Sequence, residues 1–260
     1  MEKISVALAV YNEEKRIERF LKSFSSFDEI IVFDKSSTDN TASLCLNSGA
    51  KVISIPYTDR SDFGKEVIQI ARNNWLLFVT ASDIIHPDLY KALIDLINKK
   101  DISVDIVYVP YMIYAHGISS IHSVFDSDYR PCLVKKDVVI FHDRVHEEVS
   151  FDSDKKYYLP KSRKIAIHHL THENMDSSFE RIIRYTKEEL KKEQTLMKCL
   201  KIIFITIIQG IKRRFWVLGW DGVAMLLLLL NYHITVFLRT WEKKRNIDAE
   251  SYYNELARNL

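Results

Sequence analysis

The sequence predicts an α/β fold in which helices flank a mainly parallel sheet, followed by a helical segment at the C-terminus. Two observations support this. Over the first hundred residues, short apolar runs of strand length alternate with segments whose apolar residues recur at helical spacing, as in sheets with crossover helices. From residue 177 onward the chain reads as helical.

The first strand is predicted at residues 4–10, a nearly continuous apolar run typical of a buried parallel strand. A helix is expected to start at Glu13, with Asn12 as its N-cap, because asparagine is a favoured capping residue. Apolar residues recur at helical spacing over residues 17–24. The chain therefore begins with a strand followed by an amphipathic helix.

Further strands and helices alternate after this unit. Strands are expected at residues 29–33, 51–55 and 75–79, and helices after a capping segment at 37–39, over 62–73, and from Pro87 to about Asn98. Residues 104–150 carry aromatic, strand-like runs without helical period, and one more strand is expected within residues 157–169. The alternation predicts right-handed crossovers in the first part of the chain.

Composition narrows the functional classes. A chain of 260 residues can bury one large core, or one domain with an appendage, and its net charge of +2 gives no case for nucleic-acid binding. The three cysteines form no C-x-x-C pair, which fits a reducing cytoplasm better than a disulfide framework. The N-terminal apolar run is too short for a signal peptide and reads as a strand.

Two acidic residues follow the first two predicted strands. Glu13 comes just after the first and Asp34 stands at the tip of the second. Ligands of open α/β sheets bind outside the carboxyl ends of the strands, and a carboxylate there can accept a hydrogen bond from a nucleobase or a ribose hydroxyl. No G-x-G-x-x-G, Walker A or nucleophile motif is present, so the sequence predicts a nucleotide site of another kind.

Three segments carry a resemblance to a known family: AVYNEE at 9–14, DEIIVFDKSSTDNT at 28–41 and WLLFVTASDIIHP at 75–87. They resemble family 2 glycosyltransferases, which transfer a sugar from a nucleotide-sugar on a GT-A fold. The resemblance implies a Rossmann-like mixed sheet, with an antiparallel portion over 104–150, in a domain of residues 1–175. Residues 176–260 would form a helical, membrane-associating segment.

The likeness is closest to a small bacterial subgroup that builds lipopolysaccharide core or related surface glycans. It implies a nucleotide-sugar donor, a glycan or lipid-linked glycan acceptor, and inversion at the anomeric carbon. It also implies that Glu13, Asp34 and Asp39 hold the nucleoside. For Asp39 the alternative is a helix cap, because aspartate and serine cap helices in any case.

The third segment departs from the family pattern. Family members end this strand with Asp-x-Asp, whose carboxylates hold a divalent cation on the donor diphosphate. Here Thr80 and Ser82 occupy the positions of the two aspartates in the family motif. Only Asp83, one position after the motif, carries a carboxylate. Three alternatives stay open: Asp83 binds Mg²⁺ or Mn²⁺ at a weakened site, cationic side chains replace the metal, or the protein is catalytically degenerate.

A second candidate site lies in HDRVHEEV at 142–149, which is similar to a Val-His-Glu stretch of the family. Glu147 is the predicted base that takes the proton of the acceptor hydroxyl, with Asp143 as the runner-up. The alternative is an exposed, charged strand-to-loop segment.

Three further basic side chains could line the site. Lys65 stands where the family often carries a basic or amide residue near the donor, and the favoured alternative is an ordinary surface lysine. His168 or His169 could line the acceptor pocket or be structural. The histidine spacing gives little support for zinc, because neither stretch is an H-E-x-x-H.

Two apolar blocks, at 201–211 and 215–241, follow a charged amphipathic helix. Polar residues interrupt the longer block, basic residues flank it on both sides, and its aromatics suit a headgroup boundary. We expect helices lying on the cytoplasmic face of the bacterial inner membrane. Packing on the domain or on a second copy, and a true membrane span, are the alternatives.

Taken together with the family resemblance, these observations predict a membrane-peripheral glycosyltransferase. The first rival is a degenerate relative that acts as a binding or assembly partner. A nucleotidyltransferase is disfavoured, because that class would need a glycine-rich basic loop after the first strand, and AVYNEEKR has no glycine.

Overall fold

The computed structural model describes residues 1–56, 61–101, 103–125, 128–140, 150–190, 194–246 and 248–259. The chain divides into two compact units. One is formed by Met1–Tyr114 with Ser127–Thr171, and the other by Ala115–Asp126 with His172–Leu260.

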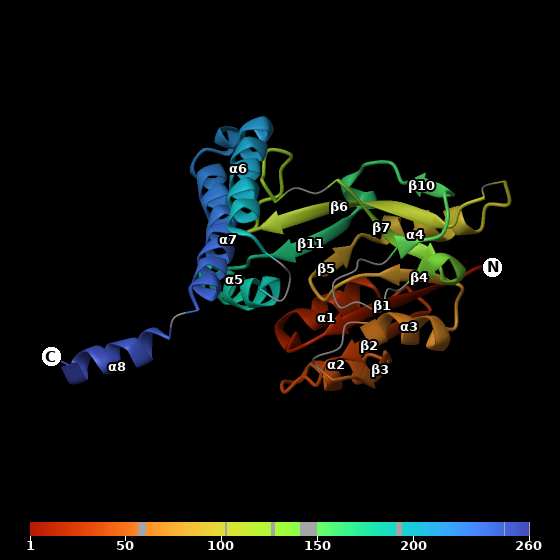
Figure 1. Cartoon of the computed structure of the whole chain (residues 1–260). Coiled ribbons are helices and arrows are strands. Elements are labelled where there is room, and N and C mark those ends of the chain that lie inside the picture. Colours follow the sequence, from red (N-terminus) through yellow and green to blue (C-terminus); the bar gives the residue numbers. More distant parts are fainter. Residues whose placement is uncertain are drawn as a thin grey trace. The chain divides into compact units, whose positions relative to one another are not determined.

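The first unit is built on a mixed sheet (Figure 1). Within the described residues its strand order is β3-β2-β1-β4-β7-β6-β11-β5, with β10 paired to β6. The strands are β1 (Ile4–Val10), β2 (Glu29–Asp34), β3 (Lys51–Ser54), β4 (Trp75–Phe78), β5 (Asp83–Ile85), β6 (Ile106–Ala115), β7 (Tyr129–Lys135), β10 (Lys156–Tyr158) and β11 (Ile167–Thr171). A separate pair joins β8 (Val139–Ile140) to β9 (Ser150–Phe151).

The first four strands in chain order form the parallel part, because β1 pairs in parallel with β2 and β4, and β2 with β3. Strand β7 pairs antiparallel with both β4 and β6, and β11 pairs antiparallel with β5. This mixed sheet with flanking helices confirms the predicted α/β class.

Apolar side chains cover both faces of the parallel part. On one face, Val6 and Leu8 of β1 belong to the core that contains Phe20 of helix α1 (Glu14–Ser23) and Leu93 of helix α4 (Pro87–Ile97). On the other face, Ala7 belongs to the core that contains Val67 of helix α3 (Ser61–Ile70). Burial on both faces explains why β1 is apolar at every position except Ser5 rather than alternating.

The predicted helix start at Glu13, with Asn12 as its N-cap, is wrong by one residue. Asn12 has a positive φ of 52° and does not cap the helix, which begins at Glu14 with Glu13 in the N-cap position. Its Oδ1 instead accepts a hydrogen bond from the amide of Thr38 at 2.8 Å. The side chain thus links the loop after β1 to the loop that precedes α2 (Thr41–Asn47).

Strand β5 has no counterpart among the expected elements. It is three residues long, which is too short to show a period, and it exists because β11 pairs with it. This pairing places His169 opposite Asp83.

The second unit is helical apart from its first segment. It contains α5 (Met175–Glu189), α6 (Leu196–Arg213), the 3₁₀ turn η3 (Phe215–Leu218), α7 (Trp220–Arg245) and α8 (Ala249–Asn259). Helices α6 and α7 pack against each other, and α5 packs on α7. The segment Ala115–Asp126 joins this unit: His122 Nδ1 lies 2.6 Å from the carbonyl oxygen of Arg213, and the Ser123 hydroxyl donates to Met225 Sδ at 3.2 Å.

Helix α7 is long and apolar enough to cross a membrane, judged by length and composition alone. Its most apolar window has a mean hydropathy of 1.6, and 28% of that window is buried. A helix of this kind is weak evidence for a span, because the core helix of a water-soluble protein has the same length and composition.

Candidate active site at the carboxyl edge of the sheet

The parallel pairing brings three of the predicted site residues to one edge of the sheet. Asp34 ends β2 opposite Val10, the last residue of β1, and Glu13 follows three residues after Val10. Asp83 follows β4, which lies on the other side of β1. This is the edge at which open α/β sheets bind ligands.

Asp34 has a carboxylate oxygen to which the described part of the chain offers no hydrogen bond. The residue is 4% exposed, and its Oδ2 accepts from the amide of Ser37 at 3.1 Å, while its Oδ1 is buried without a donor. Leaving such a group unsatisfied costs about 1–3 kcal/mol. A ligand N–H or O–H would remove this cost, so the geometry suits the nucleoside role expected from the sequence.

The pKa of the Cys45 thiol responds to burial and to the negative charge of Asp34. Burial, and then the negative charge of Asp34, raise the pKa of its thiol to about 11. The thiol therefore stays protonated near neutral pH and is no nucleophile.

The loops that follow β1 and β2 are joined by side-chain hydrogen bonds. The amide of Asn12 donates to Ser37 Oγ at 2.9 Å, and the amide of Glu13 donates to Thr41 Oγ1 at 2.8 Å. These bonds hold the two strand ends in a defined arrangement, which a binding site requires.

Asp39 accepts hydrogen bonds from the first residues of two helices, Glu14 of α1 and Thr41 of α2. Its Oδ1 accepts from the amide and hydroxyl of Thr41, at 3.0 and 2.5 Å, and its Oδ2 accepts from the amide of Glu14 at 3.2 Å. Burial raises the pKa of Asp39, but these hydrogen bonds outweigh burial, so the pKa lies below its usual 3.8. The capping alternative therefore accounts for all the contacts of Asp39 given above.

Asp83 is enclosed by donors. Its Oδ1 accepts from the Tyr111 hydroxyl and from His169 Nδ1, both at 2.8 Å. Its Oδ2 accepts from the amide of Thr80 at 2.7 Å and from the Thr80 hydroxyl at 3.1 Å. The residue is 1% exposed. Burial, and then the charge of Asp83, raise the pKa of Tyr111, so its hydroxyl remains a donor.

The residues in this region do not fit a divalent cation. Thr80 and Ser82 offer hydroxyls where carboxylates would be needed, and the oxygens of Asp83 already accept four hydrogen bonds. Within the described ranges, no three His, Cys, Asp or Glu side chains are grouped so as to hold a metal. Binding of Mg²⁺ through Asp83 would require breaking this network.

A basic side chain lies at the same place. Arg16 of α1 donates from Nη1 to Ser82 Oγ at 3.2 Å and forms an ion pair of 3.3 Å with Glu13 Oε2. Their side chains are 21% and 23% exposed, so both reach the surface.

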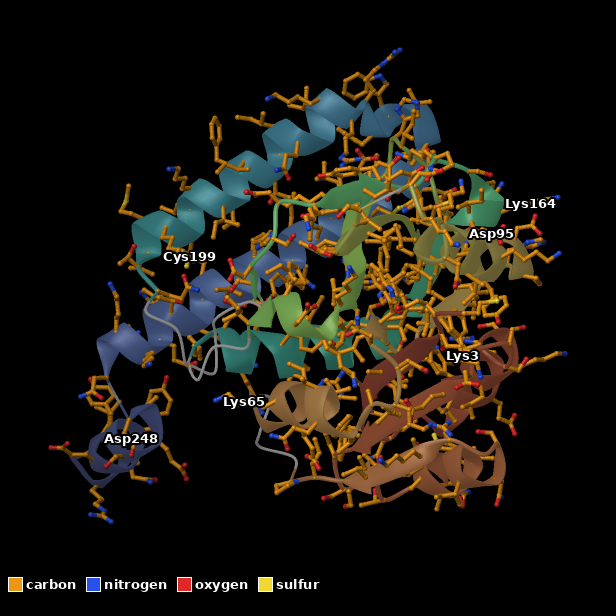
Figure 2. All side chains as sticks on the ribbon, turned by 90° about the vertical axis from the view of Figure 1, so that its right-hand side faces the viewer. Lys3, Lys65, Asp95, Lys164, Cys199 and Asp248 are labelled. Carbon is orange, nitrogen blue, oxygen red and sulfur yellow. The ribbon has the colours of Figure 1, made fainter. Side chains whose placement is uncertain are left out.

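Of the remaining predicted site residues, the structure describes one and does not describe the other two. Lys65 lies on α3 with an exposed side chain, and Figure 2 labels it. Glu147 and Asp143 lie outside the described residues, as does the rest of the segment 141–149. The catalytic base therefore stays a prediction.

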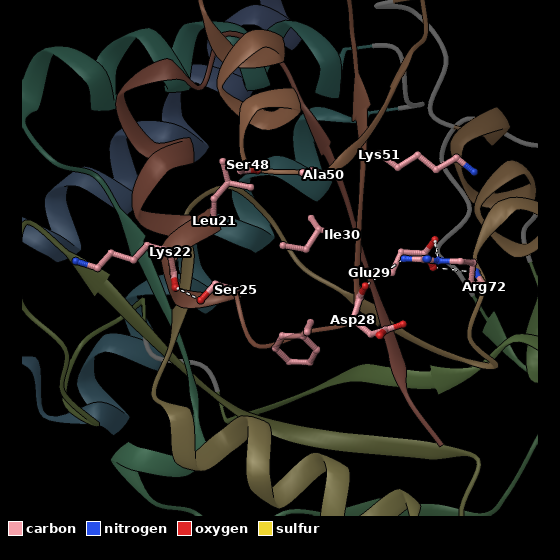
Figure 3. A pocket seen from close by; sticks show the side chains of 12 residues that line it. Leu21, Lys22, Ser25, Asp28, Glu29, Ile30, Ser48, Ala50, Lys51 and Arg72 are labelled. Carbon is pink, nitrogen blue, oxygen red and sulfur yellow. Dashed lines mark hydrogen bonds and ion pairs between the residues drawn. The ribbon is translucent and has the colours of Figure 1, made fainter. Parts of the chain in front are cut away.

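A cavity of ≈ 590 Å³ lies at the other edge of the sheet (Figure 3). It is lined by Leu21 of α1, by Asp28 and Glu29 at the start of β2, and by Arg72. Glu29 and Arg72 are paired at 3.1 Å. Because this is the amino edge of the parallel strands, the cavity is separate from the candidate site.

Sequence reasoning did not single out Tyr111 or Arg16. Tyr111 lies inside an aromatic strand, and nothing local marks its hydroxyl as a partner of a carboxylate 28 residues away. Arg16 reads as an ordinary polar position of an amphipathic helix. His169 was expected either to line a pocket or to be structural, and its bond to Asp83 shows a structural contact at the site.

Comparison with known proteins gives a consistent result. The model of glycosyl transferase family 2 matches residues 5–146. An uncharacterized glycosyltransferase of Rickettsia bellii is 24% identical over 241 residues, covering 85% of this chain and 80% of that protein. The SPbeta prophage-derived glycosyltransferase SunS of Bacillus subtilis is 30% identical over 151 residues, which are 56% of this chain but 34% of SunS.

Among solved structures, glucosyl-3-phosphoglycerate synthase from Mycobacterium tuberculosis, in complex with Mn²⁺, UDP and glucosyl-3-phosphoglycerate, is similar to part of this chain. The two are 26% identical, with a TM-score of 0.36, over 43% of this chain and 44% of that one.

Proposed function

Because the chain belongs to glycosyl transferase family 2, we propose that its carboxyl-edge site transfers a sugar from a nucleotide-sugar to a surface-glycan acceptor. The chain is a transferase with a GT-A fold, which confirms the resemblance seen in the sequence. The lipopolysaccharide-core acceptor, the inversion and the membrane surface belong to the proposal.

The unsatisfied Oδ1 of Asp34 is the observation that supports donor binding. Asp34 is 4% exposed and lies at the strand tip, so a nucleobase N–H or ribose O–H could donate to its Oδ1. Glu13 and the loop around Asp39 would border the nucleoside. Lys65 would approach the donor from α3.

The proposed reaction is a direct displacement. The acceptor hydroxyl oxygen attacks the anomeric carbon while the bond from that carbon to the diphosphate oxygen breaks, and the electron pair leaves with the nucleoside diphosphate. Glu147, or Asp143 in its place, takes the proton of the attacking hydroxyl. A single displacement of this kind inverts the anomeric centre.

A lipid-linked acceptor is supported by the surface of α6. Its large apolar side chains recur every three or four residues along one face and are exposed: Met197 (75%), Leu200 (46%), Phe204 (64%), Ile207 (37%) and Ile211 (51%). The opposite face, which includes Thr206 and Gly210, is buried. The more apolar face of the helix thus points to solvent, as in helices that lie on bilayers.

Exposed lysines border this face, at positions 198, 201 and 212. Anionic lipids attract such residues by about 1 kcal/mol each. We therefore propose that the protein acts at the cytoplasmic surface of the inner membrane, where a growing glycan on a lipid anchor would be within reach.

Calorimetric titration with UDP, GDP and ADP tests donor binding. We expect one of the three to bind, and Asp34→Asn to weaken that binding at least about 10-fold, because a charge-assisted hydrogen bond is lost. Asp28→Asn is the matched control, since Asp28 precedes the opposite end of the same strand and pairs with Lys3. It should leave the affinity unchanged.

Failure of all three nucleotides to bind would overturn the transferase proposal and favour a degenerate assembly partner. If one binds, the matching radiolabelled nucleotide-sugars should label a lipid-extractable glycan in membranes. Labelling of water-soluble products alone would overturn the proposed acceptor.

A further inference from the structure

Arg16 brings a positive charge to the place where the family motif would put a carboxylate. Its guanidinium donates to Ser82 Oγ at 3.2 Å, and the two residues are 66 positions apart in the sequence. Ser82 occupies the position of the second aspartate in the Asp-x-Asp motif. Ser82 is 7% exposed, whereas the Arg16 side chain is 21% exposed. Arg16 therefore lies between the degenerate motif and solvent-accessible space.

The surroundings of Arg16 oppose a second cation. A divalent metal near Ser82 would be repelled by the guanidinium, with which the nearby Glu13 carboxylate is already paired at 3.3 Å. The carboxylate of Asp83 is engaged with Tyr111, His169 and Thr80. A guanidinium is permanently charged and has a planar set of N–H donors that matches phosphate oxygens. It can offset part of the negative charge of a diphosphate without the ligands that a metal needs.

Building on the donor transfer proposed above, we propose that Arg16 binds the diphosphate of the nucleotide-sugar and that donor binding needs no divalent metal. As the bond between the anomeric carbon and the diphosphate oxygen breaks, negative charge builds on the leaving phosphate. The guanidinium stabilises that charge, the role for which family members use a metal ion.

The spacing of the strands is compatible with a donor that reaches from Asp34 to Arg16. Strands β2 and β4 flank β1, so their axes are about 10 Å apart at a strand spacing of ~4.8 Å. Asp34 ends the first of these strands and Ser82 follows the second. A nucleoside at Asp34 could therefore extend its diphosphate across the end of β1 toward Arg16.

The test is calorimetric titration of UDP, GDP and ADP in EDTA and, separately, with Mn²⁺. We expect the nucleotide that binds to do so equally in both conditions. Arg16→Gln should weaken it about 10- to 100-fold, because a charge-assisted contact to phosphate is lost. The affinity of Arg16→Lys should lie between those of wild type and Arg16→Gln, since lysine keeps the charge and loses the planar donor set.

Two comparisons make the result specific. Lys15→Gln removes the same charge from the adjacent, exposed position of α1 and should leave the affinity unchanged. Binding of uridine, guanosine or adenosine, which carry no phosphate, should not respond to Arg16→Gln. Asp34→Asn should weaken both nucleoside and nucleotide, which separates the two ends of the site.

Binding that requires Mn²⁺ would overturn the role of Arg16 and leave donor binding intact. The same holds if Arg16→Gln binds the nucleotide as well as wild type does. No binding of any nucleotide in either condition would instead overturn the donor-transfer function and the role of Arg16 together. The comparison of EDTA with Mn²⁺ uses the unaltered chain, so it stays decisive even if a variant fails to fold.

Discussion

Asp39 shows at the scale of a single residue how one carboxylate can serve two helices. It accepts hydrogen bonds from Thr41 at the start of α2 and from Glu14 at the start of α1. A negative charge is favourable at a helix N-terminus, because unpaired amides and the helix dipole are directed toward it. The charged form of Asp39 is thus stabilised in the folded state.

The lowered pKa of Asp39 predicts a pH dependence of stability. Between the folded pKa and the usual value of 3.8, the unfolded chain binds more protons than the folded one. The stabilisation is therefore complete above about pH 4–5 and is lost as the pH falls through the folded pKa. Asp39→Asn, which can still cap but carries no charge, should flatten this part of the curve.

The measurement is the free energy of unfolding of wild type and Asp39→Asn by urea between pH 2.5 and 6. Asp101→Asn, at an exposed position, is the control and should follow the wild-type curve. Identical slopes for wild type and Asp39→Asn would show that the charge does not contribute.

At the scale of elements, the start of α7 depends on one glycine. A Cβ at Gly222 would lie 1.9 Å from the carbonyl oxygen of Phe215, so the η3 turn can fold back on the helix only if position 222 has no side chain. Gly219, which precedes α7, has a φ of 58° and allows the chain to reverse. These two glycines shape the connection between α6 and α7.

Gly222→Ala is expected to destabilise the helical unit by about 1–3 kcal/mol, because backbone must move to relieve the overlap. Gly210→Ala is the matched control in α6: its Cβ would meet the flexible side chain of Leu226 at 3.1 Å. That variant should cost less, since alanine also has the higher helix propensity. Chemical unfolding followed by tryptophan fluorescence distinguishes them, and equal stability of both variants would contradict the close contact.

At the scale of the whole molecule, the exposed apolar face of α6 should govern membrane association. Phe204 and Ile211 are 64% and 51% exposed. We expect the protein to sediment with vesicles containing phosphatidylglycerol, and the double variant Phe204→Ser, Ile211→Ser to lose most of this binding. Salt should weaken the wild-type interaction, because screening reduces the attraction between lysines and anionic headgroups.

Leu46→Ser is the control for this experiment, since Leu46 is 59% exposed on α2 and is not part of α6. Vesicle binding that survives the double variant would show that α6 is not the contact. Binding that persists through carbonate extraction would favour a span by α7 over a surface helix.

The sequence by itself determined the class of the fold, and it predicted the edge of the sheet at which the site is proposed. Strand β1 was predicted with its observed ends, because burial on both faces makes a parallel strand apolar along most of its length. Asp34 was predicted from its position at a strand tip. Both are local properties, and the family motifs at residues 9–14 and 28–41 reinforced them.

Only the tertiary structure decided what surrounds the departing motif at residues 80–83. The pairing of β5 with β11 sets His169 opposite Asp83, and β6 supplies Tyr111, so a carboxylate read as a metal ligand is enclosed by donors. The contact of Arg16 with Ser82 spans 66 residues. Such contacts depend on strand register and helix placement, which arise from packing of the whole domain and leave no periodic trace in the local sequence.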